Sequence, residues 1–598
     1  MKPAVPMQQE IPFEALDPQR IRMESARKKA LDLGRTRLLV TGVMFALAFG
    51  VLGARLVDLS QHGKEGAPKW RTIAQAEVAP HVVARGDVVD RAGHILATSL
   101  PTQSLYVDPK EARGAVDAAQ VADQLVAILP DLDRDQLIER IEKRGRFEWL
   151  ARNLTPDQVW AVNRLGLPGF GFRDEERRVY PFGPTFAHVL GYTDTDGRGI
   201  SGIEREFEHR LGAEGDAVVL SLDLRVQAIL RDELVRAKTN FDALGAAGVV
   251  MDVNTGEILA MASLPDFDPN QPAEARGENG FNRASKGVYE MGSTFKLFTT
   301  AMALDSGAAS LTDGYDASDP IRVARFTISD FHGKNRWLSV PEILTYSSNI
   351  GTAKMALDVG AERQKDYLGR FGLLGAPEVE LPEVGGPLYP KRWGEISTMT
   401  ISYGHGIAVS PLQVAAGVSA LVNGGVMHQP TLMKVMDTER PRGTQAIAEK
   451  TSAAMRALMR KVVRDGTGEF ANIQGYLVGG KTGTAEKQVA GGYDQKALIS
   501  SFVGVFPMTE PRYVVLAVVD EPKGTKETFG YATGGWVAAP AVGRVIARMG
   551  PMFGLAPDRS DPAAEIALGH PLYVPETKAP RRSARLDANG GSVRHAAY

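Results

Sequence analysis

Gly292-Ser293-Thr294-Phe295-Lys296 lies near the middle of the chain, and the largely apolar run Leu297–Leu304 follows it. From Phe295 to Leu304 the single charged residue is Lys296. A helix that is apolar on nearly every side is a buried helix, and a lysine inside one is costly unless it has a partner. If Ser293 opens this helix, Lys296 lies one turn further along the same face. The pattern therefore predicts a serine hydroxyl beside a buried amine.

Such a pair suits nucleophilic catalysis. A serine hydroxyl is a weak nucleophile until a neighbouring base takes its proton, and a lysine in an apolar setting can be neutral and act as that base. The N-terminus of a helix also favours negative charge that develops nearby. The motif fixes only two residues, so a lysine that extends its amine to the surface is the structural alternative.

The composition limits the chemistry. The 598 residues allow two to four domains, and a net charge of −2 gives no electrostatic reason to expect nucleic acid binding. The absence of cysteine excludes disulfides, thiolate metal sites and cysteine nucleophiles. The ten histidines form no cluster with ligand spacing. We therefore expect no metal and no cofactor.

A tail and an anchor are predicted at the N-terminal end. Residues 1–37 are polar and rich in Arg and Lys, and an uncharged run from Leu38 to Ala54 continues at Leu56 and Val57. This run is at the short end for a transmembrane helix, which needs about 20 residues. Positive charge before it predicts a cytoplasmic tail (1–37), an anchor (38–57) and an external remainder. A cleaved signal peptide and a buried soluble helix are the alternatives.

The segment 58–222 is predicted to be a mixed α+β domain of strands and loops with one helical patch, at Ala118–Lys143. Asp87–Ala97 has the pattern of a hairpin whose turn is Arg91–Gly93. Nothing in the segment resembles a carboxylate site for glycosyl transfer. We expect a structural or docking role for it by default.

The segment 223–556 is predicted to be an α/β domain. The expected order is helix, strand pair, long helical insert, three strands and helix, at Leu224–Phe241, Ala247–Val253 with Glu257–Ser263, Tyr476–Lys487, Ala497–Phe506, Arg512–Asp520 and Ala538–Met549. Because hairpins join the strands, this order predicts a largely antiparallel sheet covered by helices on both faces. Residues 557–598, rich in Pro, Arg, Ala and Gly, are predicted to be a disordered tail.

Two further short motifs follow the serine–lysine pair. Ser347-Ser348-Asn349 comes after a helical stretch at Val340–Tyr346, and Lys481-Thr482-Gly483-Thr484-Ala485 lies within a predicted strand. Alone, a Ser-x-Asn motif is more often a helix cap or a turn. Together, the three motifs have the order, spacing and context of the trio found in penicillin-binding proteins and class A β-lactamases.

The neighbouring residues strengthen this resemblance to the transpeptidase family of penicillin-binding proteins. It is carried by Asn282-Arg283-Ala284, Tyr289–Lys296, Gly404-His405-Gly406, Asn423-Gly424-Gly425, Gly466-Thr467-Gly468 and Gly480–Ala485. Residues 85–215 resemble the pedestal (a non-catalytic, dimerisation-type domain) of class B members. The whole arrangement is similar to the division-specific type. Met291 departs from the family, because many members have proline before the glycine, but this puts no catalytic group in doubt.

The resemblance implies a peptidoglycan D,D-transpeptidase that cross-links stem peptides during septal cell-wall synthesis and is inhibited by β-lactams. Ser293 would attack the carbonyl between the two terminal D-alanines, and Lys296 would take its proton. Ser347 would relay a proton to the leaving amine, with Lys481 polarising its hydroxyl.

The same resemblance implies the substrate contacts. Asn349 would hold the substrate amide, Thr482 and Thr484 would bind the terminal carboxylate, and Gly483 would allow close backbone approach. The oxyanion would lie between the backbone N–H groups of Ser293 and Thr484.

Several related functions stay open. An elongation-type class B transpeptidase has nearly the same motifs, and a D,D-carboxypeptidase differs only in the acceptor that reaches the acyl-enzyme. A β-lactamase would need a Glu-x-x-x-Asn element, which does not follow Asn349. A bifunctional enzyme would need a glycosyltransferase domain, for which 58–222 is too short. The non-enzyme alternative is an anchored divisome scaffold or a β-lactam sensor.

The family also implies location and partners. The expected location is the bacterial inner membrane, with a single-pass anchor and the catalytic domain in the periplasm. The expected partners are peptidoglycan stem peptides, β-lactam antibiotics, a polytopic membrane glycosyltransferase and other divisome proteins.

Overall fold

The structure is a computed structural model that describes residues 37, 39–54, 84–323, 326–436, 443–489, 492–555 and 569. The chain divides into two compact units, Met1–Val82 and Val83–Tyr598. The predicted disordered tail, 557–598, lies outside the described residues except for Gly569. Most of the predicted cytoplasmic tail, 1–37, lies outside them as well.

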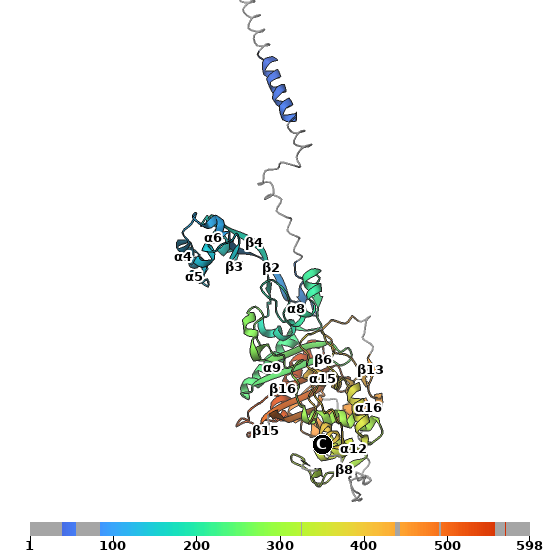
Figure 1. The fold of residues 1–598 in the computed structure, drawn as a ribbon. Coiled ribbons are helices and arrows are strands. Elements are labelled where there is room, and N and C mark those ends of the chain that lie inside the picture. Colours follow the sequence, from blue (N-terminus) through green and yellow to red (C-terminus); the bar gives the residue numbers. More distant parts are fainter. Residues whose placement is uncertain are drawn as a thin grey trace, which may run out of the picture. The chain divides into compact units, whose positions relative to one another are not determined.

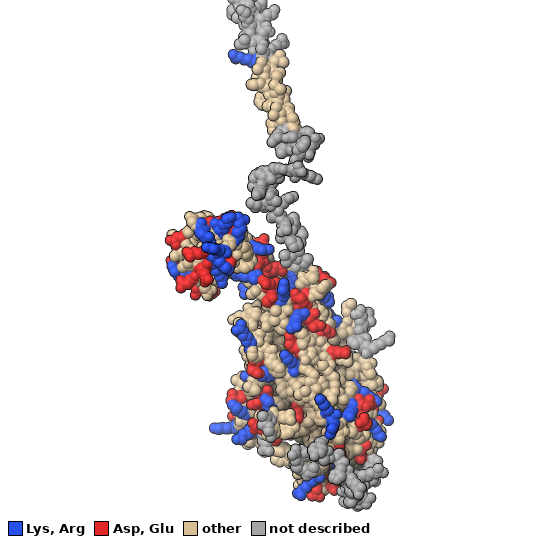
Figure 2. All heavy atoms as spheres, viewed as in Figure 1, with Lys and Arg blue, Asp and Glu red and all other residues tan. Residues whose placement is uncertain are grey.

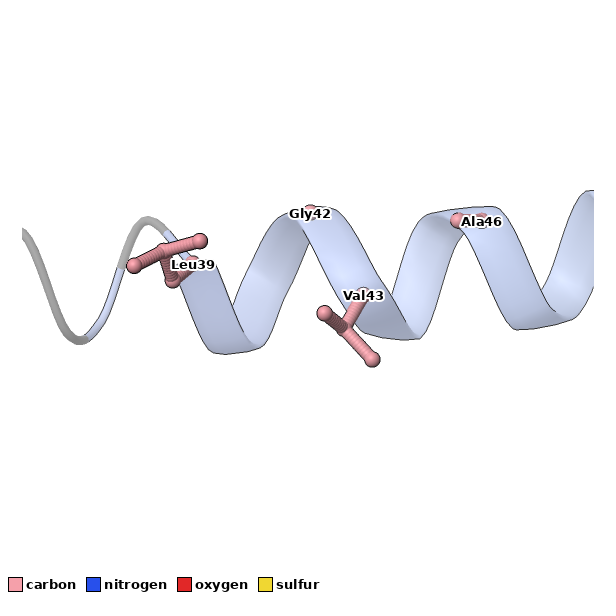
Figure 3. Close-up of a pocket in the computed structure, with 4 residues that line it drawn as sticks. All are labelled: Leu39, Gly42, Val43 and Ala46. Carbon is pink, nitrogen blue, oxygen red and sulfur yellow. The ribbon is translucent and has the colours of Figure 1, made fainter.

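The described part of the first unit is a helix over residues 39–54. Its apolar side chains are exposed, and Figure 3 shows four of its residues, Leu39, Gly42, Val43 and Ala46, which line a shallow hollow without any polar side chain. None of the helices in the described part of the chain is both long enough and apolar enough to cross a membrane.

The pedestal, which begins the second unit, is built on a five-stranded sheet with the order β3-β2-β1-β5, in which β4 also pairs with β2 (Figure 1). The strands are β1 Val88–Val89, β2 Ile95–Val107, β3 Glu148–Leu154, β4 Phe170–Val179 and β5 Val218–Val219. The predicted hairpin is confirmed, because β1 pairs antiparallel with β2 and the Gly93 N–H donates to the Asp90 carbonyl. Three short helices complete this part of the chain: α3 Pro109–Ala112, α7 Ala187–Leu190 and α8 Gly202–Glu206. Of these, α7 and α8 contact the second domain, whereas Ala112 of α3 belongs to the core formed by α4, α5 and α6.

The predicted helical patch at Ala118–Lys143 is two helices, α4 Ala118–Ile128 and α5 Arg134–Glu142. Pro130 falls between them, and a proline cannot continue a helix. The Asp133 carboxylate then accepts a hydrogen bond from the Gln136 N–H at 2.8 Å and caps the second helix. With α6 Pro156–Asn163 they enclose a small separate core. Figure 2 shows acidic and basic side chains mixed over this region, so the face in view has no uniform positive surface for a nucleic acid.

A buried ion triad ties the base of the pedestal together. The Glu204 carboxylate is fully buried and accepts from Arg85 Nε at 2.7 Å and from Arg178 Nε at 2.7 Å. Arg85 Nη2 also donates to the Glu204 carbonyl at 2.7 Å. These contacts join the start of the pedestal, the end of β4 and α8. Neither arginine can be solvated if the carboxylate is lost.

We expect Glu204→Gln to lower the free energy of unfolding of the pedestal by about 3 kcal/mol, because it leaves the buried Arg178 guanidinium without a carboxylate partner and Arg85 with only the partly exposed Glu208. Hydrogen exchange of the pedestal amides, measured on the full chain, reports this change. Glu208→Gln is the matched control: Glu208 pairs with Arg85 at 2.8 Å but its side chain is 43% exposed, so its loss should cost less than about 1 kcal/mol. Equal effects of the two variants would contradict the role of the buried triad.

The second domain is built on a five-stranded antiparallel sheet with the order β14-β15-β16-β6-β7 (Figure 1). The strands are β6 Gly245–Asp252, β7 Ile258–Leu264, β14 Gly479–Val489, β15 Gly492–Phe506 and β16 Tyr513–Asp520. β6 and β16 are buried along nearly their whole length, which predicts cover on both faces. Every pair in this sheet is antiparallel, as the sequence predicts.

Helices cover both faces of this sheet. On one face, α9 Leu224–Asn240 and α17 Gly534–Met549 pack on alternate residues such as Ala246 and Val250. On the other, the intervening residues, such as Val249, pack into the core that contains α10 Lys296–Asp305, α15 Pro411–Val422 and α16 Glu449–Asp465.

The helical insert between β7 and β14 adds four further helices: α11 Val340–Thr345, α12 Asn349–Val359, α13 Ala361–Arg370 and α14 Glu395–Ser402. Three small strand pairs complete it: β8 Gly314–Asp316 with β11 Trp337–Ser339, β9 Ile321–Val323 with β10 Phe326–Ile328, and β12 Val426–Met427 with β13 Thr444–Gln445.

Candidate active site

Ser293 lies in a tight 3₁₀ turn, η5 Gly292–Phe295, and α10 begins at Lys296. The helix therefore starts three residues later than the sequence suggests, although Lys296 still follows Ser293 by one turn. Ser293 is half-buried, whereas Lys296 is fully buried. The turn thus presents a reachable hydroxyl above an amine that water does not reach.

Glycines allow this turn to press against the edge strand β14. At Gly292, which has a φ of +50°, a Cβ would lie 2.5 Å from the Thr484 carbonyl oxygen. At Gly483, a Cβ would lie 2.4 Å from the Met291 carbonyl oxygen and 2.6 Å from Thr294 Oγ1. These distances leave no room for side chains. The nucleophile turn and the Lys481–Thr484 segment are therefore packed backbone to backbone.

Lys296 bridges the first motif to the second. Its Nζ donates to the Ser347 carbonyl oxygen at 2.5 Å and to Ser347 Oγ at 3.1 Å. Burial, together with the positive charge of Lys481, holds the pKa of the Lys296 amine well below its usual value, and Asp330 opposes this shift. A buried amine whose pKa is lowered and which is bonded to a serine hydroxyl is suited to proton transfer.

Ser347 and Asn349 sit where α11 ends and α12 begins. Ser347 has a φ of +60°, a conformation that is uncommon for a residue with a side chain. Asn349 is the first residue of α12, and its side-chain N–H donates to the Ser329 carbonyl at 2.9 Å. The strained junction turns the Ser347 hydroxyl toward Lys296.

Lys481 is the second buried lysine of the site. Its Nζ donates to Thr467 Oγ1 at 3.4 Å and to the Thr482 carbonyl at 3.1 Å and hydroxyl at 3.2 Å. Burial lowers the pKa of this amine to about 7. Its hydrogen bonds in the described residues go to threonines, whereas the Ser347 hydroxyl is bonded to Lys296.

Each of the two threonines of β14 has a hydrogen-bond partner outside the strand. Thr482 Oγ1 lies 2.8 Å from Thr467 Oγ1, and Thr484 Oγ1 accepts from the Gly534 N–H at 3.0 Å. Thr467 belongs to the Gly-Thr-Gly segment that follows α16. A hydroxyl pair beside a buried amine is suited to binding a carboxylate.

Sequence reasoning missed Asp330. Its Oδ2 accepts from the Ser348 hydroxyl at 2.6 Å and its Oδ1 from the Ile350 N–H at 2.9 Å. Ser348, the middle residue of the second motif, is buried and caps α12 by accepting from the Gly351 N–H at 3.0 Å. Asp330 lies in a loop that no short motif marks, so its approach to Ser348 is a result of tertiary folding.

We expect Asp330→Asn to slow acylation by a β-lactam about tenfold, because a neutral amide weakens two hydrogen bonds that orient the junction carrying Ser347 and Asn349. Second-order acylation rates of the full chain measure the change. Asp319→Asn, at an exposed position in the same insert, is the control and should leave the rate unchanged. A normal rate in Asp330→Asn would remove Asp330 from the positioning of the motif.

A second missed group surrounds Glu290, three residues before Ser293. Glu290 Oε1 accepts from the Gly406 N–H at 2.9 Å and from the Tyr493 hydroxyl at 3.1 Å. His405 Nδ1 lies 3.7 Å from Glu290 Oε2, and burial lowers the pKa of His405. These contacts tie the nucleophile turn to the Gly404–Gly406 loop and to the start of β15.

Comparisons with known proteins show the family of both domains. The family described as "Penicillin binding protein transpeptidase domain" matches residues 246–547, and the family described as "Penicillin-binding Protein dimerisation domain" matches residues 80–225. The chain is 44% identical over 485 residues to the probable peptidoglycan D,D-transpeptidase FtsI of Caulobacter vibrioides, covering 79% of this chain and 82% of that protein. It is 32% identical over 559 residues to the peptidoglycan D,D-transpeptidase FtsI of Escherichia coli K12, covering 88% and 92%.

Two solved structures share the fold. The apo transpeptidase domain of Burkholderia pseudomallei penicillin-binding protein 3 is 34% identical and has a TM-score of 0.51, covering 57% of this chain and 97% of that one. Mycobacterium tuberculosis penicillin-binding protein 3, solved with aztreonam, shares the fold at a TM-score of 0.62 and 24% identity, covering 79% and 97%. The chain therefore belongs to the penicillin-binding proteins, as a class B peptidoglycan D,D-transpeptidase of the FtsI type.

Proposed function

We propose that Ser293 is the acylated nucleophile and that Lys296 and Ser347 move the proton. The Lys296 amine takes the Ser293 proton as the oxygen attacks the carbonyl between the two terminal D-alanines. It then returns a proton through Ser347 Oγ, 3.1 Å away, to the departing amine. The observation that carries this proposal is the fully buried, depressed-pKa amine of Lys296 in direct contact with the second motif.

The edge strand supplies the substrate contacts. We assign the binding of the substrate's terminal carboxylate to Thr482 and Thr484, with the buried amine of Lys481 supplying positive charge beside them. Asn349 holds the substrate amide, and the oxyanion lies between the N–H groups of Ser293 and Thr484. The close packing at Gly292 and Gly483 supports this, because it brings the turn and the strand within reach of one small group.

Mapping of the covalent adduct tests the assignment. Incubation of the full chain with benzylpenicillin should add one penicilloyl group, and digestion followed by mass spectrometry should place it on the peptide that contains Ser293. An adduct on another serine, or none on a folded sample, would overturn the proposal.

The acceptor distinguishes cross-linking from hydrolysis. With a donor peptide that ends in two D-alanines and an amine acceptor, we expect the full chain to form the transfer product in preference to the free acid. Release of the free acid alone at saturating acceptor would favour the carboxypeptidase reading.

We also infer the domain boundaries and the location. The proposal is a tail at 1–37, an anchor at 38–57, the pedestal at 58–222, the transpeptidase domain at 223–556 and a terminal tail at 557–598, with the catalytic domain in the periplasm. The exposed apolar helix at 39–54 supports an association with lipid. The full chain should stay in membranes washed at high pH, and a chain that begins at residue 58 should be released. Release of both would overturn the anchor.

Partners follow from the same inference. A polytopic membrane glycosyltransferase and other divisome proteins would contact the anchor and the pedestal. The test is to purify the full chain and the chain that begins at residue 58 from detergent and to compare the amount of glycosyltransferase that co-purifies with each.

A further inference from the structure

Three aromatic side chains gather around Trp536 near the N-terminal end of α17. The ring centroids of Phe470, Phe529 and Tyr531 lie 4.6, 6.0 and 6.3 Å from that of Trp536, and the Tyr531 ring is parallel to it within 7°. Phe529 is 79% exposed, and Phe470 and Tyr531 are each about 40% exposed. We call these four residues the aromatic cluster. Exposed aromatic groups that gather in one patch mark a binding surface.

The aromatic cluster adjoins the carboxylate end of the proposed site. A Cβ on Gly535, next to Trp536, would lie 3.0 Å from the Thr467 carbonyl oxygen and 3.8 Å from Thr482 Cγ2. The preceding glycine, Gly534, donates its N–H to Thr484 Oγ1. The backbone just before Trp536 therefore packs against the threonines to which the terminal carboxylate is assigned.

This end of the site is where the leaving group departs. When the carboxylate of the terminal D-alanine is bound by Thr482 and Thr484, that residue leaves past them. The incoming amine must approach the ester carbonyl from the side that the leaving amine has vacated, so the acceptor chain extends over the same threonines. An acceptor amine is an ammonium at neutral pH, and aromatic faces attract ammonium groups by about 0.5–2 kcal/mol.

We propose that the aromatic cluster is the acceptor subsite, where Phe529 and Trp536 hold the ammonium-bearing side chain of the second stem peptide before transfer. This rests on the proposed function of Ser293. The bound ammonium first releases one proton to water. In the transfer step, the neutral amine nitrogen then bonds to the acyl carbon and the ester bond to Ser293 Oγ breaks. The proton lost by the amine returns to Ser293 Oγ through Lys296, so atoms and charges balance.

The experiment measures the two half-reactions separately on the full chain in detergent. A thioester analogue of the donor acylates Ser293, and an N-acetyl-lysine amide with a free ε-amine serves as the acceptor. We expect Phe529→Ala and Trp536→Leu to raise the apparent KM for the acceptor about fivefold to tenfold. The second-order rate of acylation by the donor should change less than twofold. The effect should therefore appear in the fraction of acyl-enzyme that is transferred to the acceptor rather than hydrolysed by water.

Three controls distinguish failure of the acceptor subsite from failure of Ser293 as the nucleophile. Trp160→Leu removes an aromatic side chain that is 62% exposed on the pedestal and should leave partition unchanged. The norleucine analogue, which lacks the amine, should compete at least tenfold more weakly than the lysine acceptor; equal competition would overturn the ammonium assignment. An unchanged acceptor KM in both variants of the cluster would overturn the subsite and leave Ser293 in place. A wild-type chain that is never acylated would overturn both.

Discussion

Ser293→Ala should abolish covalent labelling by a fluorescent penicillin. The other hydroxyl of the turn, Thr294 Oγ1, belongs to a fully buried residue packed against Gly483, so it cannot replace the nucleophile. Loss of Ser293 Oγ therefore removes the acyl-enzyme rather than slowing its formation. The expected fall in acylation rate is at least about 10⁴-fold, which is below detection on a gel. Because the substitution removes one oxygen from a half-buried residue, thermal unfolding of the variant should match that of the wild type.

The control for this variant is Ser310→Ala, which removes an exposed hydroxyl in the loop after α10. It should label like the wild type. Undiminished labelling of Ser293→Ala would refute the assignment of the nucleophile, whatever the fold of the sample.

Lys296→Met should slow acylation about 10³-fold, because methionine fills the same buried space but can neither accept the Ser293 proton nor donate to Ser347. The same change should raise the free energy of unfolding at pH 7. The pKa of the Lys296 amine is depressed in the folded protein, so between that pKa and about 10.4 the unfolded chain binds more protons than the folded one. The stability of the wild type therefore rises with pH across this window.

Methionine does not titrate, so the stability advantage of Lys296→Met should be largest at low pH and should shrink as the pH approaches 10. Thermal unfolding at pH 7 and pH 9.5, together with acylation rates, checks both effects. Lys450→Met, at an exposed position on α16, is the control and should change neither. Normal acylation of Lys296→Met would remove the lysine from the role of base.

The parts of the site that depend on local spacing could be predicted from the sequence. The apolar run after Ser293 indicates a buried Lys296 because helix periodicity acts over a few residues. The antiparallel sheet follows from strand and turn patterns of the same short range. The start of α10 is three residues late because Gly292 needs its positive φ to approach Thr484, and spacing alone does not report such a contact.

The partners of each site residue depend on tertiary folding. The sequence suggests that Lys481 polarises Ser347, but the structure places Lys296 against that hydroxyl and Lys481 against Thr467 and Thr482. Asp330 lies in a loop, and the aromatic cluster draws its four residues from the turn that contains Phe470, the loop before α17 and α17 itself. Their roles become visible only when segments that are distant in the chain meet.

The pairing of β6 with β16 has a consequence for biogenesis. Tyr513 faces Asp252 in this register, so the middle of the sheet joins two segments made at widely separated times during translation. A chain made from its N-terminal end would hold the β6–β7 hairpin without β16, the second partner of β6, until β16 had been made. The apolar edge of β6 would stay open to mispairing during that interval, so the sheet can close only when nearly all of this domain is present.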